Sequence, residues 1–243
     1  MPDSAEEYLS IGDAAKLSDV SIDTLRRWDE SGKFRAIRTS GGHRVYRKHD
    51  IEIFLSDLLG IAYDWVSSSE PLELPHSVYC QTSSIFQARL SKMQTVFGSD
   101  PAIADYFSLF VAITGEIGSN SFDHNIGNWP DIQGILFAFD IHKKQIILAD
   151  RGLGILQTLR RVRPNLASHA EALQVAFTEV VSGREPEGRG NGLKFVRKVM
   201  QDYPINLLFQ TGDASLTLKN EEKDLKIVQV PKLIKGCLAL ITF

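Results

Sequence analysis

The chain has 243 residues, 43% of them hydrophobic, and a formal net charge of −3, values typical of a soluble globular protein of one or two domains. No apolar run is long enough to cross a bilayer, and the first ten residues lack the basic and apolar regions of a secretory signal. The two cysteines, Cys80 and Cys237, exclude a disulfide framework and a clustered zinc site. We expect a cytoplasmic protein without membrane attachment.

The first 65 residues predict a small unit of short helices. A helix is expected over residues 11–17, followed by a turn and a second helix that begins after Ser21 as its N-cap. Ile22, Leu25 and Trp28 recur every three residues on this second helix, and we expect them to face the core. Two strands are expected around a turn at Gly41 and Gly42, and a closing helix over residues 50–65.

Positive charge is concentrated in this unit. Residues 26–48 contain eight lysines and arginines, opposed only by Asp29 and Glu30. A local basic patch on an acidic protein is typical of a nucleic-acid-binding module, although a solvated basic face explains the charge equally well. The segments "IGDAAKL", "TLRRW" and "HRVY" decide between these readings, because their order resembles the winged helix-turn-helix of MerR-type regulators and excisionase-like proteins.

This resemblance implies that double-stranded DNA is a partner, with the second helix in the major groove and the wing along the phosphates. The candidate DNA contacts that follow from it are Thr24, Arg26, Arg27, Arg38, His43, Arg44 and Tyr46. Arg26 and Arg27 could instead form surface salt bridges with Asp29 and Glu30 and make no DNA contact. The long dimerisation helix of MerR regulators is not matched, so a homodimer would have to form through the rest of the chain.

A Ser- and Pro-rich segment over residues 66–77 predicts a linker between domains 1–65 and 78–243. The second domain is expected to begin with a long helix over 101–125, followed by strands over 132–140 and 144–150. Helices are then expected over 168–181 and 192–200, and four strands over 205–211, 214–220, 225–230 and 236–243. Strands mixed with helices predict an α+β fold in which helices cover one face of a sheet.

Three motifs of this second domain carry chemistry. Glu116, Asn120 and Asp123 or His124 share one face of the long helix. Asn120 is a candidate magnesium ligand, because Mg²⁺ prefers oxygen ligands and keeps several waters. Glu116 could orient or deprotonate a nucleophile near a γ-phosphate. By itself, however, such a stripe is more often a solvated helix face.

The other two motifs are rich in glycine. Asp150 follows an apolar strand, and Gly152 and Gly154 after it would leave room for an adenine ring whose amino group the carboxylate accepts. Further on, "GRGNGL" precedes a helix, an arrangement that offers main-chain N–H groups to a phosphate. Either motif alone is also typical of an ordinary turn or flexible loop. Their order along the chain, together with the helix stripe, favours a nucleotide site.

"EIGSNSFDH", "DRGLG" and "GRGNGL" resemble the N, G1 and G2 boxes of the GHKL ATPase superfamily, over roughly residues 77–243. The resemblance implies a Bergerat α/β sandwich with a mixed sheet that binds ATP and Mg²⁺. It makes Glu116 the candidate general base, Asn120 the magnesium ligand and Asp150 the adenine contact. Further candidate cofactor-binding residues are Asp123, Gly152, Gly154, Gly188, Arg189, Gly190, Asn191, Gly192 and Leu193. Residues 155–187 would form a mobile lid, and Arg184, Arg189 and Lys194 would help to neutralise phosphate.

The leading functional hypothesis is an ATP-binding transcriptional regulator in which nucleotide modulates operator binding. The alternative is an anti-sigma-type serine/threonine kinase tethered to DNA, with a STAS-like protein as its partner. A third hypothesis is an interaction module that no longer binds ATP. A histidine kinase is disfavoured because no helix with a phosphoacceptor histidine precedes the second domain, and rapid hydrolysis because there is no room for a transducer domain.

Overall fold

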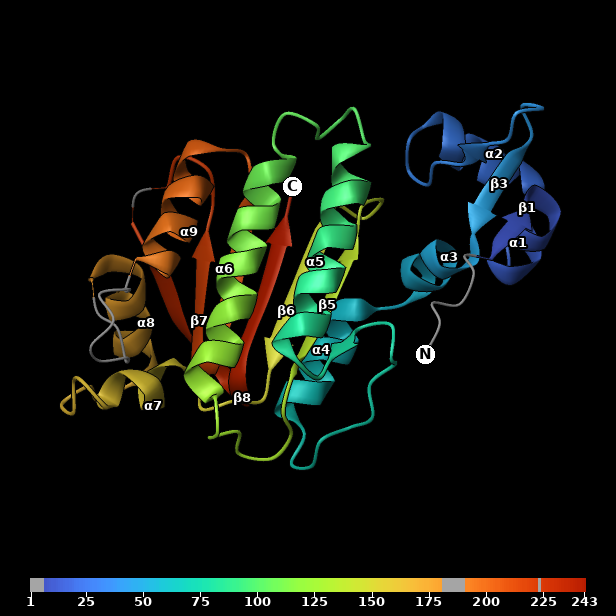
Figure 1. The fold of residues 1–243 in the computed structure, drawn as a ribbon. Helices are drawn as coiled ribbons and strands as arrows, with labels where there is room; N and C mark the ends of the chain where they lie inside the picture. The colour runs from blue at the N-terminus through green and yellow to red at the C-terminus, as the bar shows by residue number, and fades with distance from the viewer. Residues whose placement is uncertain (1–6, 181–190, 223) are drawn as a thin grey trace. The chain divides into compact units, whose positions relative to one another are not determined.

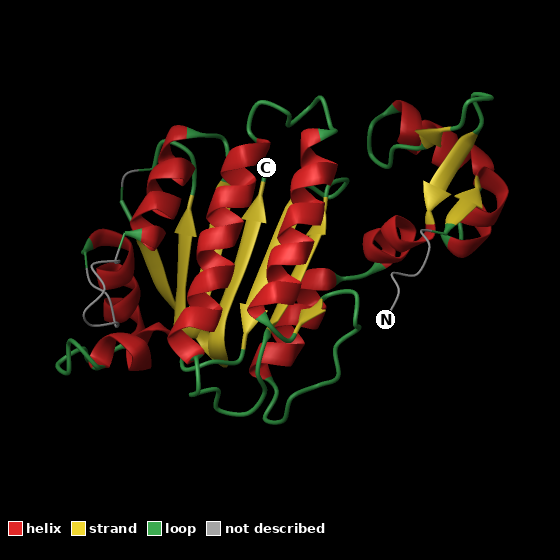
Figure 2. Ribbon diagram, viewed as in Figure 1, coloured by secondary structure: helices red, strands yellow, loops and turns green. Residues whose placement is uncertain are grey.

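The computed structural model describes residues 7–180, 191–222 and 224–243. The chain divides into two compact units, Met1–Leu58 with Asp140–Gln145, and Leu59–Phe139 with Ile146–Phe243. Figures 1 and 2 show their helices and strands. None of the described helices combines the length and the apolar character needed to span a membrane.

The first unit is a three-stranded sheet with helices packed against it (Figure 1). The central strand β3 pairs antiparallel with both β1 and β2. The first two predicted helices and the two wing strands are confirmed, and the Ser21 side chain accepts a hydrogen bond from the Thr24 N–H as the predicted N-cap. In chain order the elements are β1 (Tyr8–Ser10), α1 (Ile11–Leu17), α2 (Ile22–Glu30), β2 (Ile37–Arg38), β3 (Arg44–Arg47) and α3 (Lys48–Leu55).

The core of this unit forms where α2 meets β3. Leu25 is fully buried, and Phe34 stacks on the Tyr46 ring with 5.5 Å between the ring centroids. Trp28 packs against the same cluster, as its spacing predicted. Ile22 does not: it is 40% exposed, which contradicts the prediction. Ile22 is the first residue of α2 and lies at the end of the helix, away from the residues that pack in the core.

The closing helix predicted over residues 50–65 is two helices, α3 and α4 (Leu58–Ser67). The helical hydrogen bonds stop at Ser56, whose ψ of 142° is extended. Leu58, Ala62, Trp65 and Val66 of α4 are all buried, and their spacing places them on one face of the helix. Because the two units divide after Leu58, almost all of α4 belongs to the second unit.

The second unit is built on a five-stranded sheet of order β4-β5-β6-β8-β7. Helices α5, α6 and α9 lie side by side across one face of it (Figure 1), so the predicted α+β class is confirmed. β4 pairs antiparallel with β5, and β7 with β8. The elements after α4 are β4 (Tyr79–Cys80), α5 (Ser83–Gly98), α6 (Phe107–Asn125), β5 (Ile135–Asp140), β6 (Gln145–Asp150), α7 (Gly154–Arg160), α8 (His169–Thr178), α9 (Gly192–Asp202), β7 (Asn206–Leu218) and β8 (Lys226–Thr242).

The four strands predicted at the end of the chain are instead two long ones, β7 and β8. The segment that resembled a break contains Gly212, which has a φ of +57° and lies at an irregularity in the pairing register. A bulge of this kind bends a ladder without ending it. The long helix also begins later than predicted, at Phe107, because residues 101–106 form turns.

Close packing of α5 against α6 holds the α6 stripe in place. Gly118 of α6 faces the Phe86 ring of α5, and a Cβ atom on Gly118 would lie 2.2 Å from that ring. A larger residue at this position would therefore push the two helices apart. Phe86 is fully buried and also contacts Phe137 on β5, so the same side chain ties α6 to the sheet.

Candidate functional site

Asp150 is a buried carboxylate at the end of β6, only 2% exposed. Its Oδ2 accepts a hydrogen bond from the Ser121 hydroxyl of α6 at 2.7 Å, and its Oδ1 accepts from the Gly152 N–H at 2.8 Å. Burial raises the pKa of Asp150 above its usual value, while the bonds from Ser121 and Gly152 act in the opposite direction. Helix α6 and the turn after β6 therefore meet at this acid.

Both glycines of that turn have close neighbours within the chain. A Cβ on Gly152 would lie 2.1 Å from the Asn125 amide nitrogen, so Gly152 makes room for that side chain. Gly154 has a φ of +71°, a region that L-residues rarely adopt, and a Cβ there would lie 2.9 Å from the Thr211 hydroxyl. Packing within the chain thus requires glycine at both positions, whether or not a ligand binds.

The sequence reasoning missed several residues that surround Asp150. Gly236 of β8 has a φ of +60°, and a Cβ on it would lie 2.3 Å from Asp150 Oδ1. The Thr211 hydroxyl donates to the Gly236 carbonyl at 2.8 Å. Ser121 lies beside the predicted stripe and could have been found there. Thr211 and Gly236 left no signal in the sequence, because only the strand order β6-β8-β7 of the folded sheet brings them near Asp150.

The predicted stripe of α6 also reaches α9. The Asn120 amide donates to Glu116 Oε1 at 3.3 Å, and both side chains are half-buried. A Cβ on Gly192, the first residue of α9, would lie 1.6 Å from that same Glu116 oxygen. Since Ser121 of this helix bonds Asp150, α6 contacts both the turn after β6 and the N-terminus of α9.

Two further stripe residues, Asp123 and His124, are half-buried. Burial lowers the pKa of His124, and the nearby positive charge of Arg161 lowers it further, so the neutral imidazole is favoured. Among the residues that the structure describes, no group of three or more His, Cys, Asp or Glu side chains could hold a metal ion.

Part of the third motif lies outside the described residues, namely Gly188, Arg189 and Gly190, as does Arg184. Asn191 is the exposed N-cap residue of α9, and Leu193 is half-buried in its first turn. Lys194 donates through Nζ to the Glu179 carbonyl, and burial lowers its pKa. Lys194 thus contacts the end of α8.

The segment predicted to be a lid, residues 155–187, contains most of α7 and all of α8. These helices share a small apolar cluster of their own, and its buried members are Leu156, Leu159, Leu166, Ala172 and Val175. The mobility of this segment stays a prediction.

In the first unit, the predicted DNA-contacting residues of α2 lie toward its surface. Arg26 is exposed and pairs with Asp23 at 2.9 Å, one turn back on the same helix. Arg27 is also exposed, and Thr24 is half-buried in the first turn of the helix. An exposed ion pair of this kind contributes at most about 1 kcal/mol, so Arg26 can readily exchange Asp23 for a phosphate.

Asp29 joins α2 to the wing. Its Oδ2 accepts hydrogen bonds from Arg38 and Arg44 of the wing strands, both at 2.6 Å, and its Oδ1 accepts from the Ala36 N–H at 2.9 Å. Burial alone would raise the pKa of Asp29, but the bonds from Ala36 and Arg44 and the charge of Arg38 outweigh it and lower the pKa. The sequence had suggested Asp29 only as a counter-charge for the helix arginines.

The remaining wing residues divide into surface and core. His43 is exposed at the turn, where its N–H donates to the Thr39 hydroxyl. Tyr46 is 2% exposed, stacks on Phe34 and donates its hydroxyl to the Leu25 carbonyl at 3.4 Å. The prediction that Tyr46 contacts phosphate is therefore wrong, because alternation along β3 turns its ring into the core.

Comparison with known proteins identifies the first unit. Residues 10–46 match the model of the MerR family regulatory protein, a span that runs from the N-cap of α1 nearly to the end of β3. A search of the curated proteins found no match to the chain. The first unit therefore contains a MerR-family helix-turn-helix domain, the type with which transcriptional regulators bind DNA.

Proposed function

We propose that this DNA-binding transcriptional regulator binds ATP with Mg²⁺ in its second unit, and that bound nucleotide changes its affinity for DNA. The MerR-family match supports the DNA-binding part. The nucleotide part is supported by one observation: helix α6 touches two glycine motifs, through Ser121 at Asp150 and through Glu116 at Gly192.

The chemistry of Asp150 suits the amino group of a purine. An ionised carboxylate can accept about four hydrogen bonds, and the Ser121 hydroxyl and the main-chain N–H groups of Gly152 and Cys237 occupy three of these positions. A charge-assisted hydrogen bond in a buried site is stronger than one in water. The adenine amino group would donate to this carboxylate, and Gly152, which has no side chain, would line the approach.

The surroundings of Glu116 suit the phosphate end. The first turn of α9 offers main-chain N–H groups and the positive end of the helix dipole, and Gly192 brings this turn against the Glu116 carboxylate. Asn120 would hold the Mg²⁺ ion, which keeps most of its waters and needs no cluster of carboxylates. When bound, the ion supplies charge neutralisation at the phosphates; Glu116 would orient a water beside them.

Nucleotide can change DNA binding only if it prefers one arrangement of the protein over another. The test begins with the purified full chain, which selects its preferred duplexes from a random-sequence library. The Kd for a selected duplex is then measured with and without ATP–Mg²⁺. We expect a change of about 5- to 150-fold, the usual range of allosteric coupling. An unchanged Kd, in wild type and in Asp150→Ala alike, would refute the proposal.

Replacing Asp29 with asparagine should lower sequence specificity while it raises non-specific DNA affinity. The change removes one negative charge, which strengthens attraction to any duplex. It also releases Arg38 and Arg44 from the residue that holds the wing against α2. Asp23→Asn is the matched control, because it removes the same negative charge from the same helix and breaks only the exposed ion pair with Arg26.

The ratio of Kd values for random and selected duplexes measures this specificity. We expect about a tenfold lower ratio in Asp29→Asn, within the range of about 1–3 kcal/mol that one misplaced base contact costs. The ratio of Asp23→Asn should stay close to that of wild type. Equal ratios in the two variants would mean that Asp29 does not position the wing.

A further inference from the structure

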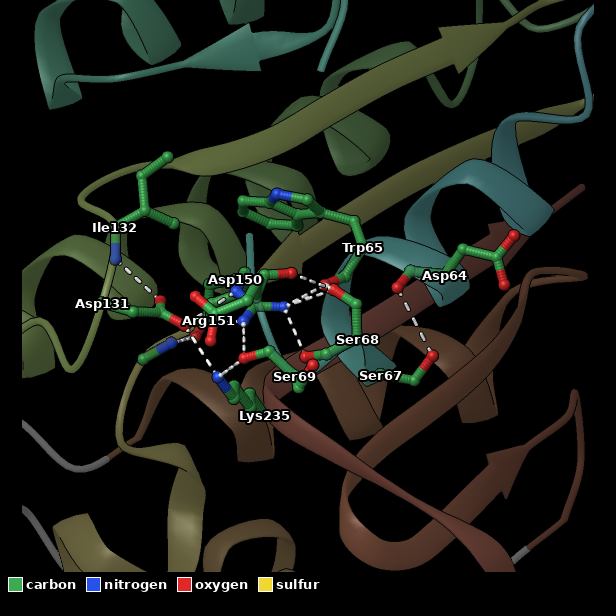
Figure 3. Close-up of polar contacts among 12 residues, drawn as sticks. Asp64, Trp65, Ser67, Ser68, Ser69, Asp131, Ile132, Asp150, Arg151 and Lys235 are labelled. Atoms are coloured by element: carbon green, nitrogen blue, oxygen red, sulfur yellow. Dashed lines mark hydrogen bonds and ion pairs between the residues drawn. The ribbon is translucent and has the colours of Figure 1, made fainter. Parts of the chain in front are cut away.

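Arg151, the residue after Asp150, is fully buried with a side-chain exposure of 0%. Its guanidinium reaches away from β6 to the end of α4 (Figure 3). It donates to the Trp65 carbonyl, to the Ser68 carbonyl at 3.1 Å and to the Ser69 carbonyl at 3.3 Å. One arginine next to the candidate nucleotide site thus donates to three main-chain carbonyls, one in the last turn of α4 and two just after the helix.

A second set of bonds fixes this guanidinium. Asp131 Oδ2 accepts from Arg151 Nη2 at 2.6 Å and from Lys235 Nζ at 2.9 Å, and Lys235 also donates to the Ser69 carbonyl at 2.6 Å (Figure 3). Burial alone would raise the pKa of Asp131, but the bonds from Arg151 and Lys235 outweigh it and lower the pKa. A positive group at the C-terminal end of a helix also interacts favourably with the helix dipole.

This hydrogen-bonded network provides the polar contacts that hold α4. The apolar contacts come from the buried face of α4, which includes Ala62, Trp65 and Val66. The Trp65 indole N–H is buried without a hydrogen-bond partner in the described part of the chain, and such an unpaired donor disfavours the docked state. The bonds from Arg151 therefore act together with this apolar face in holding α4 in place.

The turn between Asp150 and Gly152 leaves little freedom for Arg151 to move independently. The Gly152 N–H bonds the Asp150 carboxylate, and a Cβ on Gly236 would lie 2.2 Å from the Asp150 main-chain oxygen. Any shift of this turn on ligand binding at the Asp150 carboxylate would therefore move the Arg151 backbone as well. Closely packed elements convert such small shifts into discrete rearrangements.

We propose that Arg151 is a positioning residue that couples ligand binding at Asp150 to the docking of α4, the helix that follows the MerR-family unit along the chain. The inference rests on the proposed function, since it takes ATP–Mg²⁺ as the occupant. It names the route by which ATP–Mg²⁺ acts, which is the set of bonds from Arg151 to the carbonyls at the C-terminal end of α4 and just after it. Linkage is reciprocal, so loosening α4 must also weaken nucleotide binding.

Trp65 fluorescence reports on the docking of α4, because the ring is on the buried face of this helix and the Arg151 guanidinium lies 6.0 Å from its centroid. In a full-length parent protein carrying Trp28→Phe and Trp129→Phe, Trp65 is the one remaining tryptophan. ATP–Mg²⁺ is titrated into this parent, followed by Trp65 emission and, in parallel, by calorimetry. We expect the emission to shift along the calorimetric isotherm.

Arg151→Lys keeps the charge but cannot reproduce the several directed bonds of the guanidinium. In this variant we expect about tenfold weaker ATP binding by calorimetry and no shift of Trp65 emission at saturation. Asp131→Asn, which removes the negative charge shared by Arg151 and Lys235, should also reduce the shift of Trp65 emission. Lys232→Met is the matched control: Lys232 of β8 also contacts α4, through an ion pair with the exposed Asp64 and over the Tyr63 ring, but it makes no bond to the helix carbonyls, and its loss should leave the shift unchanged.

The outcomes separate the two proposals. If calorimetry detects no ATP binding by the parent, both the proposed function and the coupling are overturned. If ATP binds but Trp65 emission does not change, the coupling alone is overturned. The same holds if the shift persists undiminished in Arg151→Lys and Asp131→Asn. The parent titration decides the matter even if Arg151→Lys fails to fold.

Discussion

Asp150→Asn is expected to weaken ATP binding about 100-fold, since the charge-assisted bond it removes is worth up to about 3 kcal/mol and each 1.4 kcal/mol is tenfold in affinity. Asparagine has nearly the shape of aspartate and can still accept from the Gly152 N–H through its oxygen. It carries no negative charge, and its NH₂ group would face the adenine amino group, donor against donor. Calorimetric titration with ATP–Mg²⁺ measures the effect.

The fold should survive this change. Burial raises the pKa of Asp150, so the folded protein binds a proton at this group more tightly than the unfolded chain does. The stability that Asp150 contributes is therefore fully present below the unfolded pKa and is lost as the pH rises through the raised folded pKa. The Tm of Asp150→Asn relative to wild type should accordingly increase as the pH rises through this range.

Asp140→Asn is the matched control for Asp150→Asn. Asp140 is a 3% exposed aspartate at the end of the neighbouring strand β5, and its Oδ1 accepts from the N–H groups of His142 and Lys143. This variant should bind ATP as wild type does. Equal ATP affinity in Asp150→Asn and Asp140→Asn would remove Asp150 from the proposed site.

Gly236→Ala is expected to destabilise the second unit by about 3 kcal/mol. A φ of +60° costs an L-residue about 1–2 kcal/mol, and the new methyl group would lie 2.2 Å from the Asp150 carbonyl oxygen, an overlap that adds about 1–3 kcal/mol. At about 2–4 °C per kcal/mol, Tm should fall by roughly 6–12 °C. Calorimetric unfolding of the full chain measures this change.

Gly127→Ala separates the backbone cost from the overlap. Gly127 lies in the same unit with a φ of +69°, and a Cβ there would have no neighbour within 4 Å. Its loss of stability should stay near 1–2 kcal/mol, the cost of the backbone conformation alone. If the two variants lose equal stability, the contact between Gly236 and Asp150 carries no packing energy.

Most of the local structure could be predicted from the sequence. Side-chain caps and apolar periodicity act within a few residues, so the helix that begins after Ser21 and the strand that ends at Asp150 were found where the structure has them. The spacing of Glu116 and Asn120 likewise placed both side chains on one helix face, and they are bonded there. Such patterns need no knowledge of distant parts of the chain.

Errors arose where local and distant interactions compete. Ser56 interrupts an apolar pattern that reads as one helix, and α4 is drawn into the second unit by its buried face and by Arg151. Gly212 reads as the end of a strand, yet the ladder between β7 and β8 continues past it. Tyr46 reads as a polar wing residue, but its ring is needed to fill the core beside Phe34.

The sequence by itself determined the MerR-like unit, the α+β class and the order of the three motifs in the second unit, because residue type and short-range spacing specify these features. Only the tertiary structure decided which partners those residues meet: Ser121 at Asp150, the wing arginines at Asp29, and the carbonyls at and just after the end of α4 at Arg151. Each of these contacts joins elements well separated along the chain. They form because packing the sheet and helices leaves buried polar groups that must find hydrogen-bond partners across the fold.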